Sequence, residues 1–396
     1  MADNKDKKVL NVPALRFPEF TEEWKEERLS KIAELSKGVG ISKEQLSEDG
    51  EPCILYGELY TKYKSEIIHK VISKTNIESS NLKRSKRNDV IIPCSGETAI
   101  DIAVARCVPF DNILLGGDLN IIRLHKDDGA FMAYQLNGKR KIDIAKLAQG
   151  VSVVHLYGEN IKAIKTYNPC LQEQQKIVKL LSMLDERIEV QNKIIEKLET
   201  LIKGIVELAF SHAATSNTLG CYITQISQRN KLGKNLPVLS VSNKHGFVEQ
   251  SEQFEDRIIA SDDTSNYKIV NINDFAYNPA RINVGSIARL KNKKCGIVSP
   301  MYICFRTLGN IIPEYLELFF KTKQFSFEVN KRLEGSVRLC LQYEGLCEIV
   351  IPVLPVEKQQ IWITRITALY DKLAIEKGLQ NNYQVQEQFL LSLMFI

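Results

Sequence analysis

The longest regular pattern in the chain is a heptad repeat that runs from Leu171 to Phe210. Apolar residues recur there at alternating spacings of four and three, which is the a/d pattern of a helix that packs along a partner helix. Pro169 precedes the stretch and no proline interrupts it, so one helix of roughly 60 Å is expected at ~1.5 Å per residue. The predicted pairing positions are Ile177, Leu181, Leu184, Ile188, Gln191, Ile195, Leu198 and Ile202.

A helix of this length cannot bury its apolar stripe alone, and the chain contains a second segment of the same kind. Residues 356–396 follow Pro355 without another proline, and a shift of 185 residues carries the first heptad pattern onto them. We therefore expect an antiparallel coiled coil of the two helices. The pairing positions predicted in the second helix are Trp362, Ile366, Leu369, Leu373, Glu376, Tyr383 and Leu390.

Two polar residues lie at the middle of the predicted stripes. Gln191 and Glu376 are equivalent under the shift of 185 residues. In a centred antiparallel pair they would face each other as a polar layer that fixes the register. Alternatively, the stripe drifts at this point and both side chains face solvent. The sequence leaves both interpretations open.

The same shift relates residues outside the helices. It aligns Pro52 with Pro237, Asp89 with Asp274, Gly150 with Gly335 and Gln174 with Gln359. We interpret the chain as a tandem repeat in which a globular domain is followed by a long helix, twice over. The predicted segments are a first domain at 1–168, a helix at 169–212, a second domain at 213–352 and a helix at 353–396.

The globular segments show mixed patterns, so the predicted fold class is α/β in the mixed α+β sense. In the first domain, strands are expected at 89–93, 100–108, 113–115, 120–124, 151–156 and 161–165, with a helix at 130–150. In the second domain, strands are expected at 274–277 and 285–290, and a helix at 313–323.

Composition limits the class of protein. The 396 residues are 44% hydrophobic and 26% charged, which is ordinary for folded domains and allows two separate cores. Residues 1–8 lack the apolar core of a signal peptide, and no apolar run is long enough to span a bilayer, so a cytoplasmic protein is expected. The nine cysteines form no CxxC pair, which favours reduced thiols and no zinc site.

Basic residues gather in the globular segments rather than in the helices. The net charge of +5 is compatible with a nucleic-acid partner but does not identify one, and a single basic run is usually a solvated surface. Four runs divided between the repeated domains favour a polyanionic partner. The runs are Lys83, Arg84, Lys86 and Arg87; Lys139, Arg140 and Lys141; Arg289, Lys291, Lys293 and Lys294; and Lys331, Arg332 and Arg338.

Catalytic signatures are missing from the sequence. There is no GxxxxGK[ST] phosphate-binding loop, and the five histidines are scattered without metal-site or triad spacing. Residues 277–280, reading YNPA, have only part of the Asn-Pro-Pro-aromatic loop of amino-methyltransferases, and no glycine-rich cofactor turn accompanies them. We therefore expect no enzyme activity, no metal and no cofactor bound by this chain.

The arrangement resembles the specificity subunit of type I restriction-modification systems. Each long helix opens with a Glu/Gln-rich turn after a proline, LQEQQKI at 171–177 and VEKQQIW at 356–362. The segments NVPALRFPEFTEEW at 11–24, DVIIPCSGETAIDIAVAR at 89–106 and QFLLSLMFI at 388–396 are also similar to that family. The resemblance covers essentially the whole chain.

The resemblance implies a DNA-recognition role without catalysis. Each domain would read one half of a split, asymmetric DNA target, and the paired helices would fix the spacing of the halves. One copy of the chain would dock two methyltransferase subunits, which bind S-adenosylmethionine, and in some systems restriction subunits. The competing hypothesis is a coiled-coil adapter that bridges protein partners and never binds DNA.

Candidate DNA contacts follow from residue type and position. For base edges we predict the turn 95–98 and its counterpart 281–286, together with the arginines that follow them. The named candidates are Ser95, Glu97, Thr98, Arg106, Arg281, Asn283, Ser286 and Arg289. For phosphates we predict Lys83, Arg84, Lys86, Arg87, Lys291, Lys293 and Lys294. The alternative for both turns is an ordinary hairpin connection.

Overall fold

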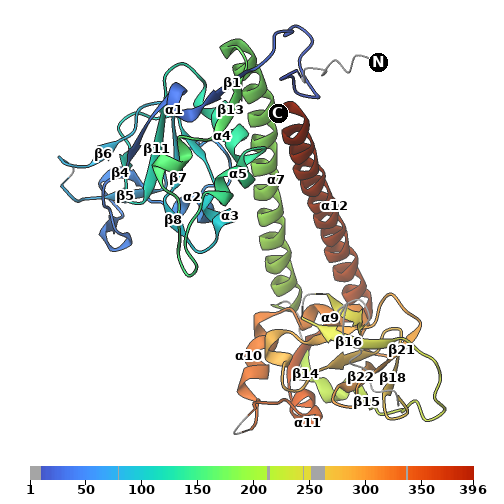
Figure 1. The fold of residues 1–396 in the computed structure, drawn as a ribbon. Coiled ribbons are helices and arrows are strands. Elements are labelled where there is room, and N and C mark those ends of the chain that lie inside the picture. The colour runs from blue at the N-terminus through green and yellow to red at the C-terminus, as the bar shows by residue number, and fades with distance from the viewer. Residues whose placement is uncertain (1–9, 79, 212–214, 244, 251–263, 336–337) are drawn as a thin grey trace, which may run out of the picture. The chain divides into compact units, whose positions relative to one another are not determined.

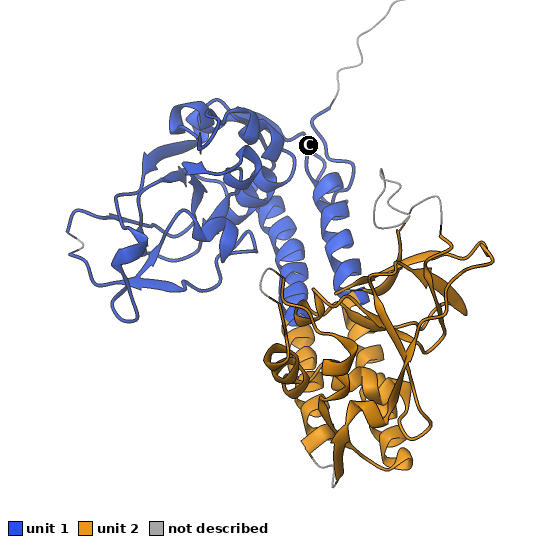
Figure 2. Cartoon of the chain, turned by 90° about the horizontal axis from the view of Figure 1, so that it is seen from below, with its two compact units in different colours: residues 1–192, 378–396 blue, residues 193–377 orange. Residues whose placement is uncertain are grey.

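The computed structural model describes residues 10–78, 80–211, 215–243, 245–250, 264–335 and 338–396. The chain divides into two compact units, which Figure 2 shows in different colours. Unit 1 comprises residues 1–192 and 378–396, and unit 2 comprises residues 193–377. The long helices α7 (Leu171–Ser211) and α12 (Val356–Met394) each contribute to both units. Each unit therefore contains one globular domain and part of both helices.

Two sheets build the domain of unit 1. One is antiparallel in the order β2-β11-β7-β9, and the other has the order β3-β5-β4-β10-β6 with β4 and β10 parallel. The first sheet consists of β2 (Ala33–Lys37), β11 (Leu119–Leu124), β7 (Asp89–Pro93) and β9 (Arg106–Val108). The second consists of β3 (Leu46–Ser47), β5 (Ser73–Thr75), β4 (Glu51–Ile54), β10 (Leu114–Leu115) and β6 (Lys83–Arg84).

Short elements complete this domain (Figure 1). They are the paired strands β1 (Lys25–Arg28) with β13 (Lys165–Asn168) and β8 (Ser95–Gly96) with β12 (Val154–His155), and the helices α1 (Leu29–Ile32), α2 (Glu58–Thr61), α3 (Ala99–Ile102), α4 (Gly129–Asn137), α5 (Lys141–Lys146) and α6 (Gly158–Ile161). Apolar side chains of β7, β9, β11 and α4 form one buried core.

Unit 2 repeats this plan. Its sheets have the orders β15-β22-β19-β20 and β17-β16-β21-β18, and β16 pairs with β21 in parallel as β4 does with β10. The strands are β14 (Thr215–Thr218), β15 (Ile223–Ile226), β16 (Val238–Ser242), β17 (Gly246–Glu249), β18 (Lys268–Asn271), β19 (Phe275–Tyr277), β20 (Ile287–Arg289), β21 (Cys295–Val298), β22 (Ile303–Thr307) and β23 (Val350–Val353). The helices are α9 (Pro313–Phe319), α10 (Lys323–Lys331) and α11 (Tyr343–Cys347).

The repeat extends to individual hydrogen bonds. The Gln174 side chain accepts from the Asp128 N–H at 2.8 Å and donates to the Pro169 carbonyl at 3.0 Å. Its counterpart Gln359 accepts from the Ile312 N–H at 2.9 Å and donates to the carbonyl of Leu354 at 2.7 Å. In each unit one buried glutamine thus joins the start of the long helix to the start of a domain helix.

The N-terminal arm, residues 11–24, binds the first turn of α7 in unit 1. Arg16 makes two hydrogen bonds of 2.7 Å to the carboxylate of Glu173, and the Trp24 indole N–H donates to the same carboxylate at 3.3 Å. Trp24 also packs edge-on against Phe131 and Phe395, with ring centroids 5.7 and 6.3 Å apart. The arm, α4 and the C-terminal residues therefore share one aromatic core.

The two long helices run antiparallel within each unit. In unit 1, residues near the start of α7 share a core with Leu390 and Met394 near the end of α12. In unit 2, Lys377 forms an ion pair with Glu199 at 2.7 Å. One apolar core of this unit contains residues from the end of α7 and from the start of α12. This confirms the predicted antiparallel pairing of two long helices.

No predicted pairing residue is exposed. Ile177, Leu181, Leu184, Gln191, Ile195, Ile202, Ile366, Leu373 and Glu376 are buried, and Ile188, Leu198, Trp362, Leu369, Tyr383 and Leu390 are half-buried. Gln191 is 7% exposed and Glu376 is 6% exposed, so neither faces solvent as one interpretation required. Glu376 forms an ion pair with Lys372 at 2.5 Å.

The structure corrects several predicted elements. The helix predicted at 130–150 is two helices, α4 and α5, because the backbone leaves the helical conformation at Gly138, whose ψ is -106°. The strand predicted at 100–108 begins as α3, and the one at 161–165 is mostly α6 and a turn before β13. Among the described residues, no helix combines the length and apolarity needed to cross a membrane.

Candidate nucleic-acid interface

A hollow of about 610 Å³ lies in the domain of unit 2, between β16, β17, β20 and the end of α9. We call it the cationic cavity, because among the described residues Arg289, Lys291, Lys293 and Lys321 line it against two carboxylates, Glu249 and Glu317. The β16-β17 hairpin brings residues 242–249 beside residues 287–293 of β20 and the segment after it. Three members of the basic run, Arg289, Lys291 and Lys293, thus lie on one concave surface, and Lys294 is not among its lining residues.

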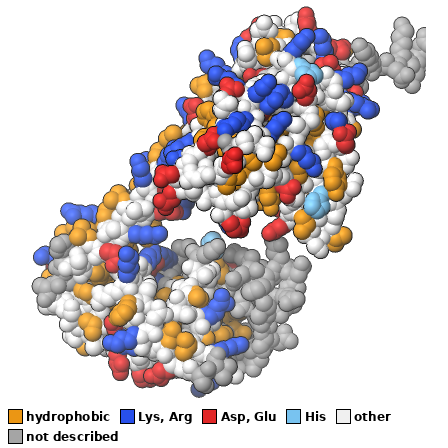
Figure 3. Space-filling view, turned by 90° about the vertical axis from the view of Figure 1, so that its left-hand side faces the viewer, with side chains coloured by type: hydrophobic (Ala, Val, Ile, Leu, Met, Phe, Trp, Pro, Cys, Tyr) orange, Lys and Arg blue, Asp and Glu red, His pale blue; other side chains and the backbone are white. Residues whose placement is uncertain are grey.

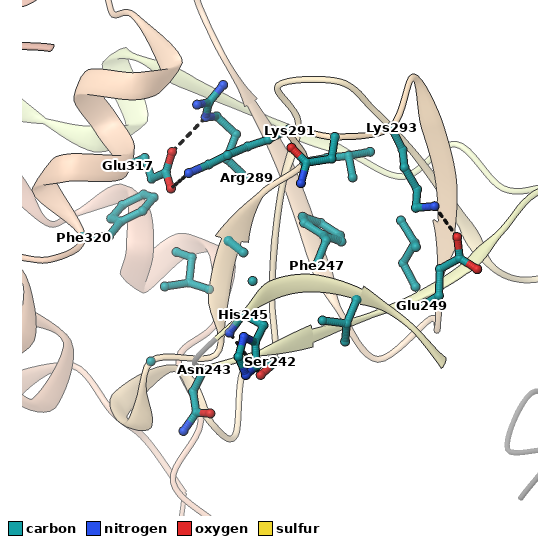
Figure 4. Close-up of a pocket in the computed structure, with 18 of the residues that line it drawn as sticks. Ser242, Asn243, His245, Phe247, Glu249, Arg289, Lys291, Lys293, Glu317 and Phe320 are labelled. Atoms are coloured by element: carbon teal, nitrogen blue, oxygen red, sulfur yellow. Dashed lines mark hydrogen bonds and ion pairs between the residues drawn. The ribbon is translucent and has the colours of Figure 1, made fainter. Parts of the chain in front are cut away.

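Ion pairs hold the cations of this cavity in place (Figure 4). The Arg289 guanidinium lies 3.0 Å from Glu317 and 2.6 Å from Glu314, and Lys291 lies 2.5 Å from Glu317. Lys293, in the segment after β20, forms an ion pair with Glu249 at the end of β17. Lys291 and Lys293 remain 48% and 39% exposed, so a phosphate can reach them by exchanging with a carboxylate.

Polar groups line the other side of the cavity. Ser242, Asn243 and His245 belong to the β16-β17 turn, where Gly246 adopts a positive φ of 68°. Figure 4 shows Asn243 and His245 on the side of the cavity opposite Lys291. Amide, hydroxyl and imidazole groups are the side chains that read base edges by hydrogen bonding. The cavity therefore combines phosphate-type and base-type contact groups.

The predicted turn 281–286 lies beside this cavity. Arg281 and Asn283 are exposed, and Gly285 contributes to the cavity wall. A 3₁₀ turn over Ile282–Val284 ends at Gly285, whose φ of 90° is a left-handed conformation that favours glycine. Ser286 is buried and its hydroxyl donates to the Val241 carbonyl at 3.1 Å. The turn thus presents two polar side chains and is anchored by the third.

The counterpart turn in unit 1 is built differently. Ser95 lies in β8, is buried, and donates to Asp118 at 3.1 Å. Thr98 caps α3 by accepting from the Asp101 N–H at 3.2 Å. Glu97 and Thr98 are exposed, and a carboxylate at this point can accept a hydrogen bond from a cytosine amine. Neither turn is a plain two-residue hairpin.

Arg106 occupies an interior position in unit 1. It is 7% exposed, donates to the Leu59 carbonyl at 3.3 Å, and lies 3.7 Å from the Glu66 carboxylate. A DNA base cannot reach this guanidinium without opening the domain. We therefore leave Arg106 out of the interface, along with the buried hydroxyls of Ser95 and Ser286.

The predicted phosphate contacts of unit 1 lie along β6 and the turn after it. Lys83 and Arg84 are half-buried, and Arg84 pairs with Glu51 at 2.7 Å. Lys86 and Arg87 are exposed, as is Lys294 in unit 2. Figure 3 shows that lysine and arginine side chains are interspersed with acidic ones on the face drawn, not gathered in one basic patch. The DNA contacts of all these residues remain predictions.

Sequence reasoning missed several groups of the cationic cavity. Asn243, His245 and Lys321 line it, but they lie well outside the basic run at 289–294 along the chain, and only long-range packing brings them to it. The alternation of apolar residues in VLSVS at 238–242, followed by a glycine turn, is a hairpin signal that could have identified the first two. No three histidine or cysteine side chains converge as zinc ligands in the part of the chain that the structure describes.

Comparisons with known proteins agree with this architecture. The model of the type I restriction modification DNA specificity domain matches residues 21–200. The type I restriction enzyme MjaVIII specificity subunit of Methanocaldococcus jannaschii is 26% identical over 209 residues, which are 52% of this chain and 46% of that protein. The match thus spans about half the length of this curated relative.

Solved structures extend the likeness to the whole chain. The S subunit of a type I restriction-modification system from M. genitalium superposes with a TM-score of 0.61 over 97% of this chain and 99% of that one, at 18% identity. A second chain, from a study of complex assembly and conformational transition in a type I R-M system, gives a TM-score of 0.55 over 93% and 96%, at 14% identity. Residues 21–200 are therefore similar to the type I restriction modification DNA specificity domain, and the whole chain shares the fold of the S subunit from M. genitalium.

Proposed function

We propose that this chain is the DNA specificity subunit of a type I restriction-modification complex and that it catalyses no reaction itself. The family match of residues 21–200, joined to a specificity-subunit fold over the whole chain, is the observation that carries the proposal. S-adenosylmethionine and the methyl transfer to DNA belong in this proposal to methyltransferase subunits. One copy of the chain serves each complex, because it already contains two recognition domains.

Each domain reads one half of a split DNA target in this proposal. The domains share their strand order but present different groups at equivalent turns: Glu97 and Thr98 in unit 1, and Arg281 and Asn283 in unit 2. Different side chains read different bases, so the target is asymmetric, unlike the palindrome that a twofold dimer reads. Lys86 and Arg87 in one domain, and Lys291 and Lys293 in the other, contact phosphates.

The long helices set the spacing of the two halves and dock the methyltransferases. Exposed apolar residues support docking, since a solvated helix seldom shows a regular apolar stripe outside its buried face. On α7 they recur at the three-, four- and seven-residue spacings of a heptad pattern, and they include Leu180, Met183, Val190, Ile194, Leu201 and Leu208. On α12 they comprise Ile361, Ile375, Leu379, Val385 and Phe389.

Co-expression with the partner methyltransferase tests the recognition role. Methylated adenines are mapped across the host genome, and a single split motif with a fixed gap is the expected result. Exchange of residues 213–352 for those of a relative should change one half of the motif only. A stable complex with no new methylation would favour the adapter hypothesis, in which the chain joins proteins without reading DNA.

Substitutions on the exposed stripe test docking separately. Val190→Glu and Leu201→Glu should weaken methyltransferase binding in pull-down and calorimetry while far-UV circular dichroism and DNA binding by the free chain stay unchanged. Glu196→Gln, an exposed polar position of the same helix, is the matched control. Unaltered methyltransferase affinity in both glutamate variants would place the docking surface elsewhere.

A further inference from the structure

Three carboxyl groups from distant parts of the chain meet inside unit 1. They belong to Glu66 in the loop after α2, Asp185 on α7 and Glu387 on α12, and their nearest ligand oxygens all lie within 4.8 Å of one another. Asp185 is only 7% exposed. The domain, the first long helix and the second long helix each contribute one group, so this acidic triad lies where these three parts of the unit pack together.

Hydrogen-bond donors around the triad are few. The Tyr134 hydroxyl donates to Asp185 at 2.5 Å, and the Ser65 hydroxyl donates to the same oxygen at 2.9 Å. Glu66 accepts from the Asn137 amide at 2.9 Å and lies 3.7 Å from Arg106. One guanidinium thus faces three carboxyl groups, which leaves an excess of negative charge if all three are ionised.

Glu387 and Asp185 bring carboxyl oxygens to within 4.8 Å of each other in a largely buried site, which disfavours two negative charges on the pair. Burial, and then the Asp185 carboxylate, raise the pKa of Glu387 to about 8. Burial also raises the pKa of Glu66, against the opposing effect of Arg106, and it raises that of Tyr134 beside Asp185. Two nearby carboxylates that share one proton behave in this way.

Asp185 and Glu387 line a hollow of about 560 Å³, and other charged groups line it with them. The domain contributes Lys62, Lys64, His69 and Lys70, α7 contributes Glu189, and α12 contributes the uncharged Gln380 and Gln384. Lys62 is engaged by Glu58 at 2.6 Å. Gln380 donates to Asn192, so a further polar contact joins the two helices next to the triad.

The repeat shows that the fold itself does not need these carboxyl groups. The positions in unit 2 equivalent to Asp185 and Glu387 are Tyr370 and Ile202, and alignment of the N-caps of α4 and α9 makes Leu318 the counterpart of Tyr134. Ile202 and Leu318 are buried in one apolar core, and Tyr370 packs against it. The same joint is therefore stable with apolar side chains, and the polar version in unit 1 adds a property that the apolar one lacks.

We propose that the acidic triad is a proton-dependent latch, which fastens residues 378–394 of α12 to α7 and to the first domain while Glu387 and Asp185 share a proton. Loss of that proton places adjacent negative charges in a poorly solvated site. The end of α12 then opens more often from unit 1. This inference does not depend on DNA recognition.

The sign of the pH dependence follows from the raised pKa. A carboxyl group that titrates near 8 in the closed state, and near 4.5 when exposed, binds its proton more tightly when closed. The latch is therefore fully effective below about pH 4.5 and weakens as the pH rises through about 8. Local opening should increase about tenfold per pH unit over much of this interval and level off above it.

Hydrogen-deuterium exchange on the full chain measures this opening. Protection factors of the amides in residues 378–394 are followed from pH 5.5 to about 9, each corrected for the intrinsic exchange rate at that pH. In the wild type they should fall with rising pH. In Glu387→Gln, which keeps a side chain of similar shape without a titrating group, they should stay nearly constant and exceed the wild-type values at high pH.

A control variant and a spectroscopic measurement test the latch further. Glu186→Gln removes an exposed carboxylate adjacent to Asp185 on α7 and should retain the wild-type pH profile. Infrared spectra of the wild type at pH 7 should show the C=O band of a protonated carboxylic acid. This band should be missing in Glu387→Gln, which gives a test that does not depend on amide exchange. The same pH profile in wild type and Glu387→Gln, or no such band at pH 7, would overturn the latch.

Discussion

The two units solve the same packing problem with opposite chemistry. Where the domain meets both long helices, unit 1 places Glu66, Asp185 and Glu387 around Tyr134, whereas unit 2 fills the equivalent space with apolar and aromatic side chains of one continuous core. Apolar packing depends on volume and is stable at any pH, while paired carboxyl groups need each donor and proton in place. A duplicated fold therefore preserves the shape of a joint and leaves its chemistry free to diverge.

A second difference concerns the first turn of each long helix. Glu173 of α7 is 1% exposed and is bound by Arg16 and Trp24 of the N-terminal arm. The equivalent residue of α12 is Lys358, which is exposed. The buried glutamine one position further, Gln174 or Gln359, is the same in both. The hydrogen bonds of the buried glutamine are thus common to both units. The contacts of the N-terminal arm with Glu173 are an addition in unit 1.

The largest effect is expected from giving unit 2 a carboxylate of the kind found in unit 1. Ile202→Glu would bury an unpaired acidic group among apolar side chains and should lower the free energy of unfolding of unit 2 by about 5 kcal/mol. Chemical denaturation with probes in each unit measures it. Leu201→Glu, at the exposed neighbouring position, should change stability by no more than about 0.5 kcal/mol. Equal losses in both variants would contradict the contrast between the units.

Two phenylalanines at equivalent positions test the shared part of the architecture. Phe210 packs on Tyr315 with ring centroids 4.6 Å apart, and Phe395 packs on Phe131 at 5.3 Å. Both are buried, so Phe210→Ala and Phe395→Ala should each cost about 3–4 kcal/mol in the unit that holds them. Differential scanning calorimetry should show the loss in a different transition for each variant. A loss confined to one of the two would show that the repeat is not energetically equivalent at this point.

The arm of unit 1 should have a smaller effect. Arg16→Ala leaves Glu173 with only the indole N–H of Trp24, and the expected cost is about 2 kcal/mol because the carboxylate loses two charge-assisted hydrogen bonds. Lys358→Ala, at the matching helix turn in unit 2, should be nearly neutral. Urea denaturation compares the two. A neutral Arg16→Ala would mean that the arm is not energetically coupled to α7.

The smallest effects concern phosphate contacts, where the two units should behave alike. Lys86→Gln in unit 1 and Lys291→Gln in unit 2 should each weaken DNA binding by a factor of about 3 to 10 for every sequence, and lower the slope of log Kd against log salt by about one unit. Titrations at several salt concentrations measure this, with Lys358→Gln on α12 as control. A loss confined to one DNA sequence would assign that lysine to base reading instead.

Part of the candidate site could be predicted from the sequence and part could not. Arg289, Lys291 and Lys293 of the predicted run line one cavity because they are near neighbours along a strand and turn, and their DNA contacts stay predictions. Arg106 and Ser95 lie inside the domain instead, since their positions depend on which face of a short strand is covered. The helix break after Asn137 was also missed, although Gly138, where the backbone leaves the helical conformation, is a local stop signal in the sequence.

The sequence by itself determined the two long helices, their antiparallel pairing and the duplication, as well as the resemblance that the comparisons confirm. Heptad spacing is a local property, so a helical stripe is readable wherever it occurs. Only the tertiary structure brought Asn243, His245 and Lys321 to the cationic cavity, or joined Glu66 with Asp185 and Glu387. These convergences depend on long-range packing, which joins residues far apart in the chain and which no local periodicity encodes.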